Sequence, residues 1–257
     1  MLVDSHCHLD APEFDNDRAA VIMRARAAGV LRQIVPAVDA AGWPKLRDIC
    51  AAETGLFPAY GLHPMYLDAH RPEHLVELRG WIERERPCAI GECGLDFFVE
   101  GLDADAQHRY FVGQLELARE YDLPVVVHAR RAVDRVIAAI RQVGSLRGVI
   151  HSFPGSAEQA RQLWQLGFLV GLGGPVTYER ANRLRKLAAT LPLECLLLES
   201  DAPDQPDAGI RGERNEPARV TSVLETIARL RDEEPAKIAA ATTRNAEQLF
   251  SLPAGAK

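Results

Sequence analysis

Short apolar runs alternate with amphipathic helical segments along the whole chain. The apolar runs are continuous stretches of hydrophobic residues, the pattern of strands that are covered on both faces. We predict eight strands, at about Leu2–Cys7, Leu31–Ala37, Phe57–Gly61, Cys88–Gly91, Val125–His128, Gly148–His151, Phe168–Gly171 and Cys195–Glu199. We predict helices between and after them, at about Asn16–Ala28, Trp43–Thr54, Glu73–Arg84, Ala104–Tyr121, Ala132–Gln142, Ser156–Leu166, Tyr178–Thr190, Glu216–Leu230 and Pro235–Phe250.

Eight strands with intervening helices favour a parallel sheet within an α/β fold. A closed TIM-like (β/α) barrel fits the strand count best. A doubly wound open sheet is the alternative, which periodicity alone does not separate from a barrel. A barrel of this kind uses about 250 residues, and no linker or low-complexity tract interrupts the 257 residues of this chain. We therefore expect residues 1–257 to form a single domain.

Charge and composition narrow the classes of function. The net charge is −6 and the pI is near 5.8, whereas a protein that holds duplex nucleic acid over a broad surface usually has a pI above about 9. Any contact with nucleic acid is therefore expected to be local. No apolar run approaches the roughly 20 residues that cross a bilayer, and the first residues lack the pattern of a signal peptide. We expect a cytoplasmic protein with no membrane partner and no organic cofactor.

Most of the histidines fall at one predicted edge of the sheet, at the carboxyl ends of the strands, where the chemistry of α/β folds collects. That edge is predicted to carry five of the eight histidines together with two acids: His6, His8, His63, Glu92, His128, His151 and Asp201. The other histidines (His70, His74 and His108) lie in charged helical or loop segments, where we expect solvated side chains.

The pattern around His6 and His8 is the first candidate for metal binding. Side chains two apart in an extended segment point to the same side, so Asp4, His6 and His8 can face inward together. Two such imidazoles can grip one cation, although spaced histidines also occur as hydrogen-bonded surface residues. Glu92 directly follows an apolar run, and a buried acid there needs a cation or a strong donor. A helix cap or a loop salt bridge is the alternative.

His128 and His151 each end an apolar strand, and Asp201 follows the last strand. Taken with His6, His8 and Glu92, they make four histidines and two acids, which can hold two divalent cations if one carboxylate bridges. The five cysteines form no CxxC pair and are expected to be reduced and mostly buried. Hard-cation sites prefer oxygen and imidazole, so the nearby cysteines are not expected to be ligands.

These residues resemble the TatD family of metal-dependent hydrolases over essentially the whole chain. The similarity lies in six motifs: Asp4-Ser5-His6-Cys7-His8-Leu9-Asp10, Gly61-Leu62-His63-Pro64, Gly91-Glu92-Cys93-Gly94-Leu95-Asp96, His128-Ala129-Arg130, His151-Ser152-Phe153-Pro154-Gly155 and Glu199-Ser200-Asp201-Ala202-Pro203. Ser200 stands where the family commonly has threonine, which keeps a hydroxyl. The surroundings of Gly173-Gly174-Pro175 are most similar to the YjjV-like branch. Asn215-Glu216-Pro217 departs from the commoner family motif, and Arg211 or Arg214 is a substitute candidate for its phosphate contact.

The resemblance implies an amidohydrolase-like barrel with two divalent metal cations (Mg, Mn or Zn). It implies that His6, His8, Glu92 and Asp201 surround one metal, and that Glu92 bridges to a second metal held by His128 and His151. No lysine stands at a predicted strand end, which agrees with a bridging glutamate in place of the carbamylated lysine of related amidohydrolases.

We therefore expect a metal-dependent hydrolase of ester bonds, a phosphodiesterase or deoxyribonuclease with nucleic acid as its substrate. Asp201 and Glu92 are the expected catalytic residues, with Asp201 accepting a proton from the activated water. His63 and Arg130 are the expected substrate-binding residues, although a structural histidine and a surface arginine are the alternatives. A carboxylic ester or amide hydrolase, such as a D-aminoacyl-tRNA deacylase, is a rival on the same metals. A binding protein with one closed structural metal site is the other rival.

Overall fold

All eight predicted strands are present in the computed structural model, which describes residues 1–253. They are β1 Leu2–Asp4, β2 Val30–Pro36, β3 Leu56–Tyr60, β4 Ala89–Asp96, β5 Val125–Arg130, β6 Gly148–Ile150, β7 Phe168–Leu172 and β8 Leu196–Leu198. They follow one another in chain order in an eight-stranded sheet. Neighbouring strands run parallel wherever their register is defined, as in β4 against β5.

The predicted helices are also present, with ends displaced by a few residues. They are α1 Arg18–Ala27, α2 Trp43–Ala52, α3 Glu73–Glu85, α4 Ala104–Glu120, α5 Val133–Val143, α6 Ala157–Gln165, α7 Asn182–Thr190, α8 Val220–Arg231 and α9 Pro235–Leu249. A short 3-10 turn at Pro217–Arg219 occupies the start of the predicted helix Glu216–Leu230, and another at Gly174–Thr177 precedes the predicted helix Tyr178–Thr190. Within residues 1–253, no helix has both the length and the apolarity needed to cross a membrane.

The chain divides into two compact units. The first unit contains Met1–Val35 and Val170–Lys257, and the second contains Pro36–Leu169. The expectation of a single domain stays a prediction.

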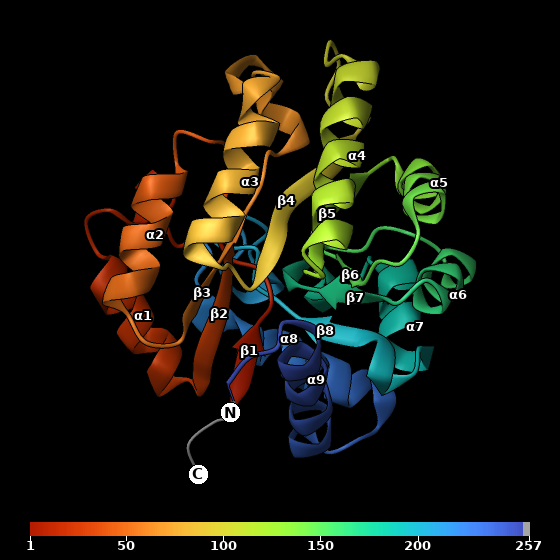
Figure 1. Ribbon diagram of the computed structural model, residues 1–257. Helices are drawn as coiled ribbons and strands as arrows, with labels where there is room; N and C mark the ends of the chain where they lie inside the picture. The colour runs from red at the N-terminus through yellow and green to blue at the C-terminus, as the bar shows by residue number, and fades with distance from the viewer. Residues whose placement is uncertain (254–257) are drawn as a thin grey trace. The chain divides into compact units, whose positions relative to one another are not determined.

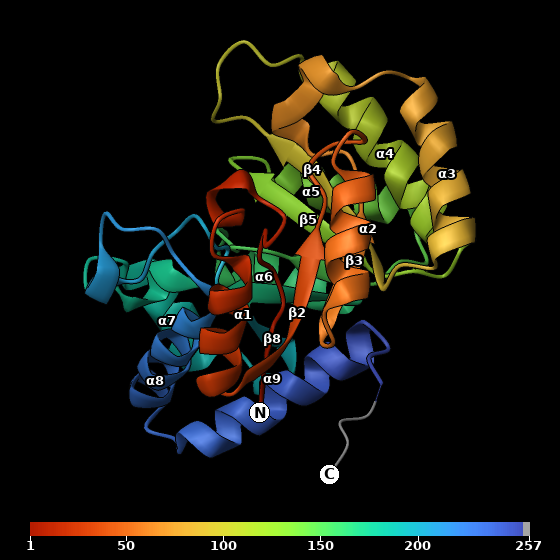
Figure 2. The ribbon, with the colours of Figure 1, turned by 90° about the vertical axis from the view of Figure 1, so that its left-hand side faces the viewer.

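In the first unit, β1 pairs with β2 and β7 pairs with β8. Helix α9 runs past the start of β1 (Figure 2), where the Thr243 hydroxyl donates to the Met1 carbonyl at 3.1 Å. The Asn245 amide donates to the carbonyls of Leu193 and Leu196 at 2.8 and 2.9 Å. These contacts tie α9 to the segment that leads into β8, so Asn245 has a structural role.

In the second unit, β4 pairs with both β3 and β5, and α3 and α4 lie side by side (Figure 1). Strand β4 extends to Asp96, five residues beyond the predicted end at Gly91, and all of its residues are buried. Glu92 is therefore inside the strand rather than after it. Gly94 makes the continuation possible, because its φ is +143° and a Cβ there would lie 2.0 Å from the carbonyl oxygen of His128.

Candidate functional site

The first cluster consists of His6, His8 and Asp201 and lies in the first unit. The segment after β1 is joined to the segment after β8 by two backbone hydrogen bonds, from Asp201 N–H to the His6 carbonyl at 2.9 Å and from His8 N–H to the Ala202 carbonyl at 2.7 Å. These bonds bring three potential ligand atoms together. The two Nε2 atoms are 3.1 Å apart, and Asp201 Oδ1 lies 3.4 Å from His6 Nε2 and 3.8 Å from His8 Nε2.

Such spacings suit a shared cation. A metal with bonds of about 2.1 Å holds adjacent ligand atoms about 3.0 to 3.4 Å apart. Both distances from His6 Nε2 fall in this range, and the 3.8 Å between Asp201 Oδ1 and His8 Nε2 is slightly longer. Asp201 adopts a φ of +58°, in the left-handed region that few non-glycine residues occupy. The Gln205 side-chain amide donates to its Oδ2, so its Oδ1 is left to face the two imidazoles. Gln205 was not predicted as a site residue, and its only sequence signal is its position four residues after Asp201.

Asp4 does not belong to the first cluster, although strand alternation predicted that it would face inward with His6 and His8. Its Oδ2 accepts a hydrogen bond from the Ser200 hydroxyl at 2.6 Å, and its Oδ1 accepts from the backbone N–H groups of Ser200 and His6 at 2.9 and 3.2 Å. Burial raises the pKa of Asp4 to about 7 despite these hydrogen bonds. Asp4 therefore positions the backbone on both sides of the cluster, and the Ser200 hydroxyl has a defined partner.

The second cluster consists of His63, Glu92, His128 and His151 and lies in the second unit. Glu92 is 1% exposed. Its Oε1 lies 2.8 Å from His151 Nε2, 3.0 Å from His63 Nε2 and 3.1 Å from His128 Nδ1. His128 Nδ1 and His151 Nε2 are 3.2 Å apart. An acid buried this deeply is stable when imidazolium groups or a cation neutralise it, and these spacings again suit ligands of one metal.

Hydrogen bonds distinguish the roles that the imidazoles can take. His128 Nε2 donates to Asp96 Oδ2 at 2.8 Å, which leaves the lone pair of Nδ1 facing Glu92 and His151. His63 has the opposite arrangement, because its Nδ1 accepts from the backbone N–H of Met65 at 3.1 Å. The proton of a neutral His63 ring is therefore on Nε2, which points at Glu92. His128 is arranged as a metal ligand, and His63 is arranged as a hydrogen-bond donor.

Asp96 ends the motif that begins at Gly91, and its contact with the site was not predicted from the sequence. Its Oδ1 accepts hydrogen bonds from the backbone N–H groups of Phe98 and Val99 at 2.8 and 3.0 Å, while Oδ2 accepts from His128. Burial opposes ionisation of Asp96, but the hydrogen bonds outweigh it and lower its pKa to about 2. Carboxylates that hold the second nitrogen of a ligating histidine are common in metal sites. The spacing of four residues from Glu92, on the same side of one strand, was the available signal.

The charge of the second cluster follows from the same contacts. Burial disfavours a charged His128, but hydrogen bonds to Asp96 and Glu92 outweigh it and raise the pKa of His128. In the metal-free protein the imidazolium form of His128 is therefore favoured by its two acidic neighbours. A cation that binds the Nδ1 atom takes the place of that proton, so metal binding is expected to release protons from this cluster.

Several other polar residues have structural roles. The thiols of Cys7 and Cys93 face the carbonyls of Ile34 and Val126, both at 3.8 Å, and burial raises the pKa of Cys93 well above its usual value. Among the described residues, neither sulfur belongs to a group of side chains that could hold a metal ion. Two guanidinium nitrogens of Arg214 donate hydrogen bonds to the two carboxylate oxygens of Asp17, at 2.8 and 2.7 Å. This pairing argues against Arg214 as a phosphate ligand.

The expectation that His70 and His74 are solvated was wrong, because both side chains are buried. His70 Nε2 donates to the His63 carbonyl at 2.9 Å, and burial lowers the pKa of His70. His74 Nδ1 accepts from the backbone N–H of Arg71 at 3.2 Å. Both imidazoles therefore support the loop that carries His63, in a segment whose charged composition concealed their burial.

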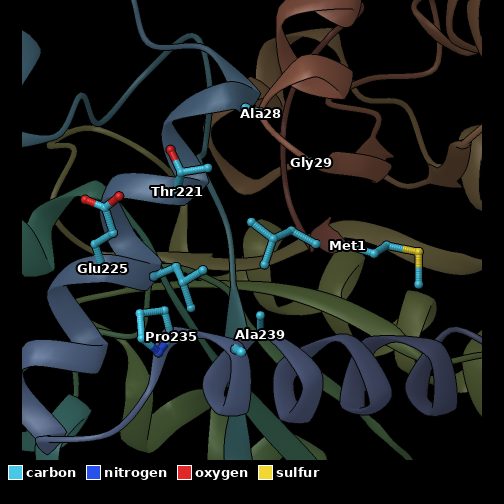
Figure 3. A pocket seen from close by; sticks show the side chains of 10 residues that line it. Met1, Ala28, Gly29, Thr221, Glu225, Pro235 and Ala239 are labelled. Atoms are coloured by element: carbon cyan, nitrogen blue, oxygen red, sulfur yellow. The ribbon is translucent and has the colours of Figure 1, made fainter.

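A pocket of about 300 Å³ lies in the first unit, at the amino end of β1 (Figure 3). Its lining includes Met1, Leu2, Leu224 and Pro235 and is mostly apolar. The residues of the first cluster follow the other end of β1, so this pocket is not part of that cluster. Chemistry in parallel α/β folds collects at the carboxyl ends of the strands, and the opposite end usually serves stability.

Comparisons with known proteins identify relatives of this chain. A family model described as TatD-related DNase matches residues 3–251. An uncharacterised metal-dependent hydrolase of Escherichia coli, YjjV, is 40% identical over 98% of both chains, and its crystal structure superposes with a TM-score of 0.95 over 98% of both chains. A protein of Erwinia billingiae named 3'-5' ssDNA/RNA exonuclease TatD is 33% identical over 98% of this chain and 100% of its own.

A more distant structure, a TatD-family hydrolase of Entamoeba histolytica, shares the fold at 20% identity, with a TM-score of 0.85 over 96% of this chain and 97% of its own. This likeness, with eight parallel strands in chain order, confirms the expected amidohydrolase-like (β/α) barrel class. The expected family is confirmed by the family model and by the identity to YjjV. The chain belongs to the TatD family of metal-dependent hydrolases.

Proposed function

We propose that this protein hydrolyses phosphodiester bonds, as a deoxyribonuclease or related nuclease, with two divalent cations (Mg, Mn or Zn). His6, His8 and Asp201 would bind one cation and His128 and His151 the other, with Glu92 bridging them. Two findings support the proposal. In each cluster, the ligand atoms are spaced as neighbours around one metal. The family model that matches the chain is described as TatD-related DNase.

The single observation that carries the proposal is the arrangement around Glu92. A buried carboxylate oxygen with three imidazole nitrogens within 3.1 Å is far more than a structural salt bridge needs. One of the imidazoles, His128, is turned by Asp96 so that a lone pair faces the cluster. A site built only for stability would gain more from apolar residues of the same volume. The cost of burying these groups therefore supports a chemical function.

Divalent cations bound to these residues would lower the pKa of a water molecule and neutralise charge that develops on phosphate oxygens. Asp201 would accept the proton of that water, and the Gln205 side-chain amide, which donates to Asp201 Oδ2, would hold its carboxylate. With the Glu92 carboxylate held by the cations, the His63 Nε2–H group, which here faces Glu92, would be the donor for a phosphate oxygen or for the leaving oxygen. Arg130, exposed at the end of β5, is the side chain proposed to bind a phosphate through its planar fork.

A carboxylic ester or amide hydrolase, such as a D-aminoacyl-tRNA deacylase, would use the same residues on another substrate, so a substrate panel decides between the two. The purified protein is analysed for metal content. It is then assayed with bis(p-nitrophenyl) phosphate, single-stranded DNA, a lactone and a D-aminoacyl ester. We expect phosphodiester and DNA cleavage that a chelator abolishes. Cleavage of the carboxylic esters alone would replace the proposed activity with the alternative.

The role of Asp201 is tested by Asp201→Asn, with Asp204→Asn as the matched control. Asp204 is exposed and lies three residues further along the same loop. Removing a general base typically costs 10²- to 10⁴-fold in rate, and Asp201→Asn is expected to fall in that range. Asp201→Asn protein that contains its metals and turns over at the wild-type rate would show that Asp201 is not the proton acceptor.

A further inference from the structure

An exposed aromatic side chain is stacked against two arginines at the ends of β4 and β5. Phe98, two residues beyond β4, is 44% exposed. The guanidinium carbon of Arg130 lies 3.6 Å from the centre of its ring, and that of Arg131 lies 4.6 Å from it. Phe98, Arg130 and Arg131, here named the Phe98 platform, all lie in the second unit.

The charges of the platform are not neutralised by the protein. Within residues 1–253, neither Arg130 nor Arg131 forms an ion pair with an acidic side chain. Some exposed arginines elsewhere are instead paired, as Arg24 is with Glu216 at 2.7 Å and Arg79 is with Glu120. The chain has a net charge of −6. Two unpaired guanidinium groups on one aromatic ring are therefore a local positive site on an acidic protein.

Stacking leaves the arginines able to bind an anion. A guanidinium group that lies over an aromatic ring uses its face, while its N–H groups lie in its plane and stay available as donors. The platform therefore presents planar surfaces for stacking together with donors that suit a phosphate. This combination is typical of proteins that bind single-stranded nucleic acids, in which bases stack on aromatic or guanidinium planes while cations contact the backbone.

One carboxylate connects the platform to the second cluster. Asp96 accepts hydrogen bonds from the backbone of Phe98 at 2.8 Å and from His128 Nε2 at 2.8 Å. Arg130 lies opposite Asp96 in the register of β4 and β5. Arg130 also follows His128 by two residues, so strand alternation places Arg130 and His128 on the same side of β5. The platform is thus held in a defined position beside a proposed metal ligand.

We propose that the Phe98 platform binds one unpaired nucleotide of a single-stranded nucleic acid. The base stacks on the planar surfaces of Phe98 and the arginines, and the adjoining phosphate accepts hydrogen bonds from the guanidinium edges. A duplex is disfavoured because both faces of a paired base are covered by its stacked neighbours. This inference rests on the proposed nuclease function and adds a substrate class to it, single strands with intact bases.

The test measures binding separately from cleavage. Fluorescence anisotropy with chelator-treated full-length protein compares a labelled single-stranded oligothymidine, the same oligomer with abasic sites, and a duplex. Stacking of one base contributes about 1 to 3 kcal/mol, so the intact single strand is expected to bind roughly 5- to 150-fold more tightly than the abasic one. Equal binding of the intact and abasic strands, or equally tight binding of the duplex, would overturn the proposal.

Variants connect the effect to the platform. Phe98→Leu is expected to abolish the preference for intact bases, and Phe98→Tyr to keep it. Trp164→Leu, at another exposed aromatic residue in the same unit, should bind like the wild type. Arg131→Gln should reduce the slope of log affinity against log salt by about 0.7, the loss of one phosphate contact on a single strand. Circular dichroism verifies that each variant is folded, and a Phe98→Leu variant that keeps the full preference rejects the platform.

Failure of this inference can be distinguished from failure of the proposed function. If the wild type cleaves bis(p-nitrophenyl) phosphate but does not discriminate between intact and abasic strands, the platform is wrong and the phosphodiesterase activity stands. If the wild type discriminates between the strands but cleaves no phosphodiester, the platform stands as a nucleic-acid site and the nuclease function is wrong.

Discussion

Replacing Asp96 with asparagine tests the organisation of the second cluster. The carboxylate accepts three hydrogen bonds, from His128 Nε2 and from the backbone N–H groups of Phe98 and Val99. Asparagine has one acceptor oxygen and one NH₂ group. If the oxygen serves the two backbone donors, the NH₂ group faces His128 Nε2 and places two donors against each other. The imidazole then relieves the conflict by moving its proton to Nδ1, the nitrogen that faces Glu92.

That proton shift removes the lone pair with which His128 would bind a cation. The loss of a carboxylate that supports a ligating histidine typically weakens metal binding by 10- to 100-fold, which corresponds to about 1.4 to 2.7 kcal/mol. We expect a loss of that size for one of the two metals. Asp96 supports a ligand of the second cluster, so the metal held by the first cluster should be affected less.

The assay is isothermal titration calorimetry of metal-free protein with zinc or manganese, supported by a competing chelator. Asp68→Asn is the control, because Asp68 is an exposed acid on a turn of the same unit. Asp68→Asn should bind both metals like the wild type. Asp96→Asn protein that is folded and binds both metals within twofold of the wild-type affinity would refute the proposed role of Asp96.

Three further predictions concern stability. Ser200→Ala removes the shortest hydrogen bond of Asp4 and should lower the free energy of unfolding in urea by about 1 to 3 kcal/mol. Ser200→Thr keeps a hydroxyl and should keep most of the stability, and equal losses for the two variants would contradict the role of the hydroxyl. Gly94→Ala should lower the stability by more than about 3 kcal/mol, because the added Cβ would meet the His128 carbonyl. Gly101→Ala, at φ +84° in open space, should cost only about 1 kcal/mol, and similar melting temperatures for the two variants would exclude the steric explanation. Burial opposes ionisation of Asp207, but hydrogen bonds from Arg219 and Gly209 outweigh it and lower its pKa, so the ionised carboxylate stabilises the fold above its unfolded pKa of about 3.9 and this stabilisation is lost as the pH falls through the lower folded value. Asp207→Asn should therefore flatten the decrease of unfolding free energy at acid pH, and an unchanged decrease would rule out this role of Asp207.

Much of the fold was predictable because its signals are local. Eight apolar runs and the amphipathic segments between them predicted the strands and helices, since strand and helix periods are properties of neighbouring residues. The position of histidines and acids at the ends of these runs also predicted which side chains belong to the two clusters, because parallel strands place their carboxyl ends at one edge. The ends of the elements were less predictable. Strand β4 continues past Glu92 and Gly94 to Asp96, and its continuation depends on pairing with β5.

The tertiary structure alone decided what each polar atom faces. The sequence indicated that His63 and His128 are site residues, but the nitrogen that each presents to Glu92 depends on Met65 N–H in one case and on Asp96 in the other. It placed Asp4 beside His6 and His8, yet the carboxylate of Asp4 is bound by Ser200, 196 residues away along the chain. Hydrogen bonds are directional and short, so the role of a buried polar group depends on partners that the fold brings together, and sequence patterns describe only the side of an element on which that group lies.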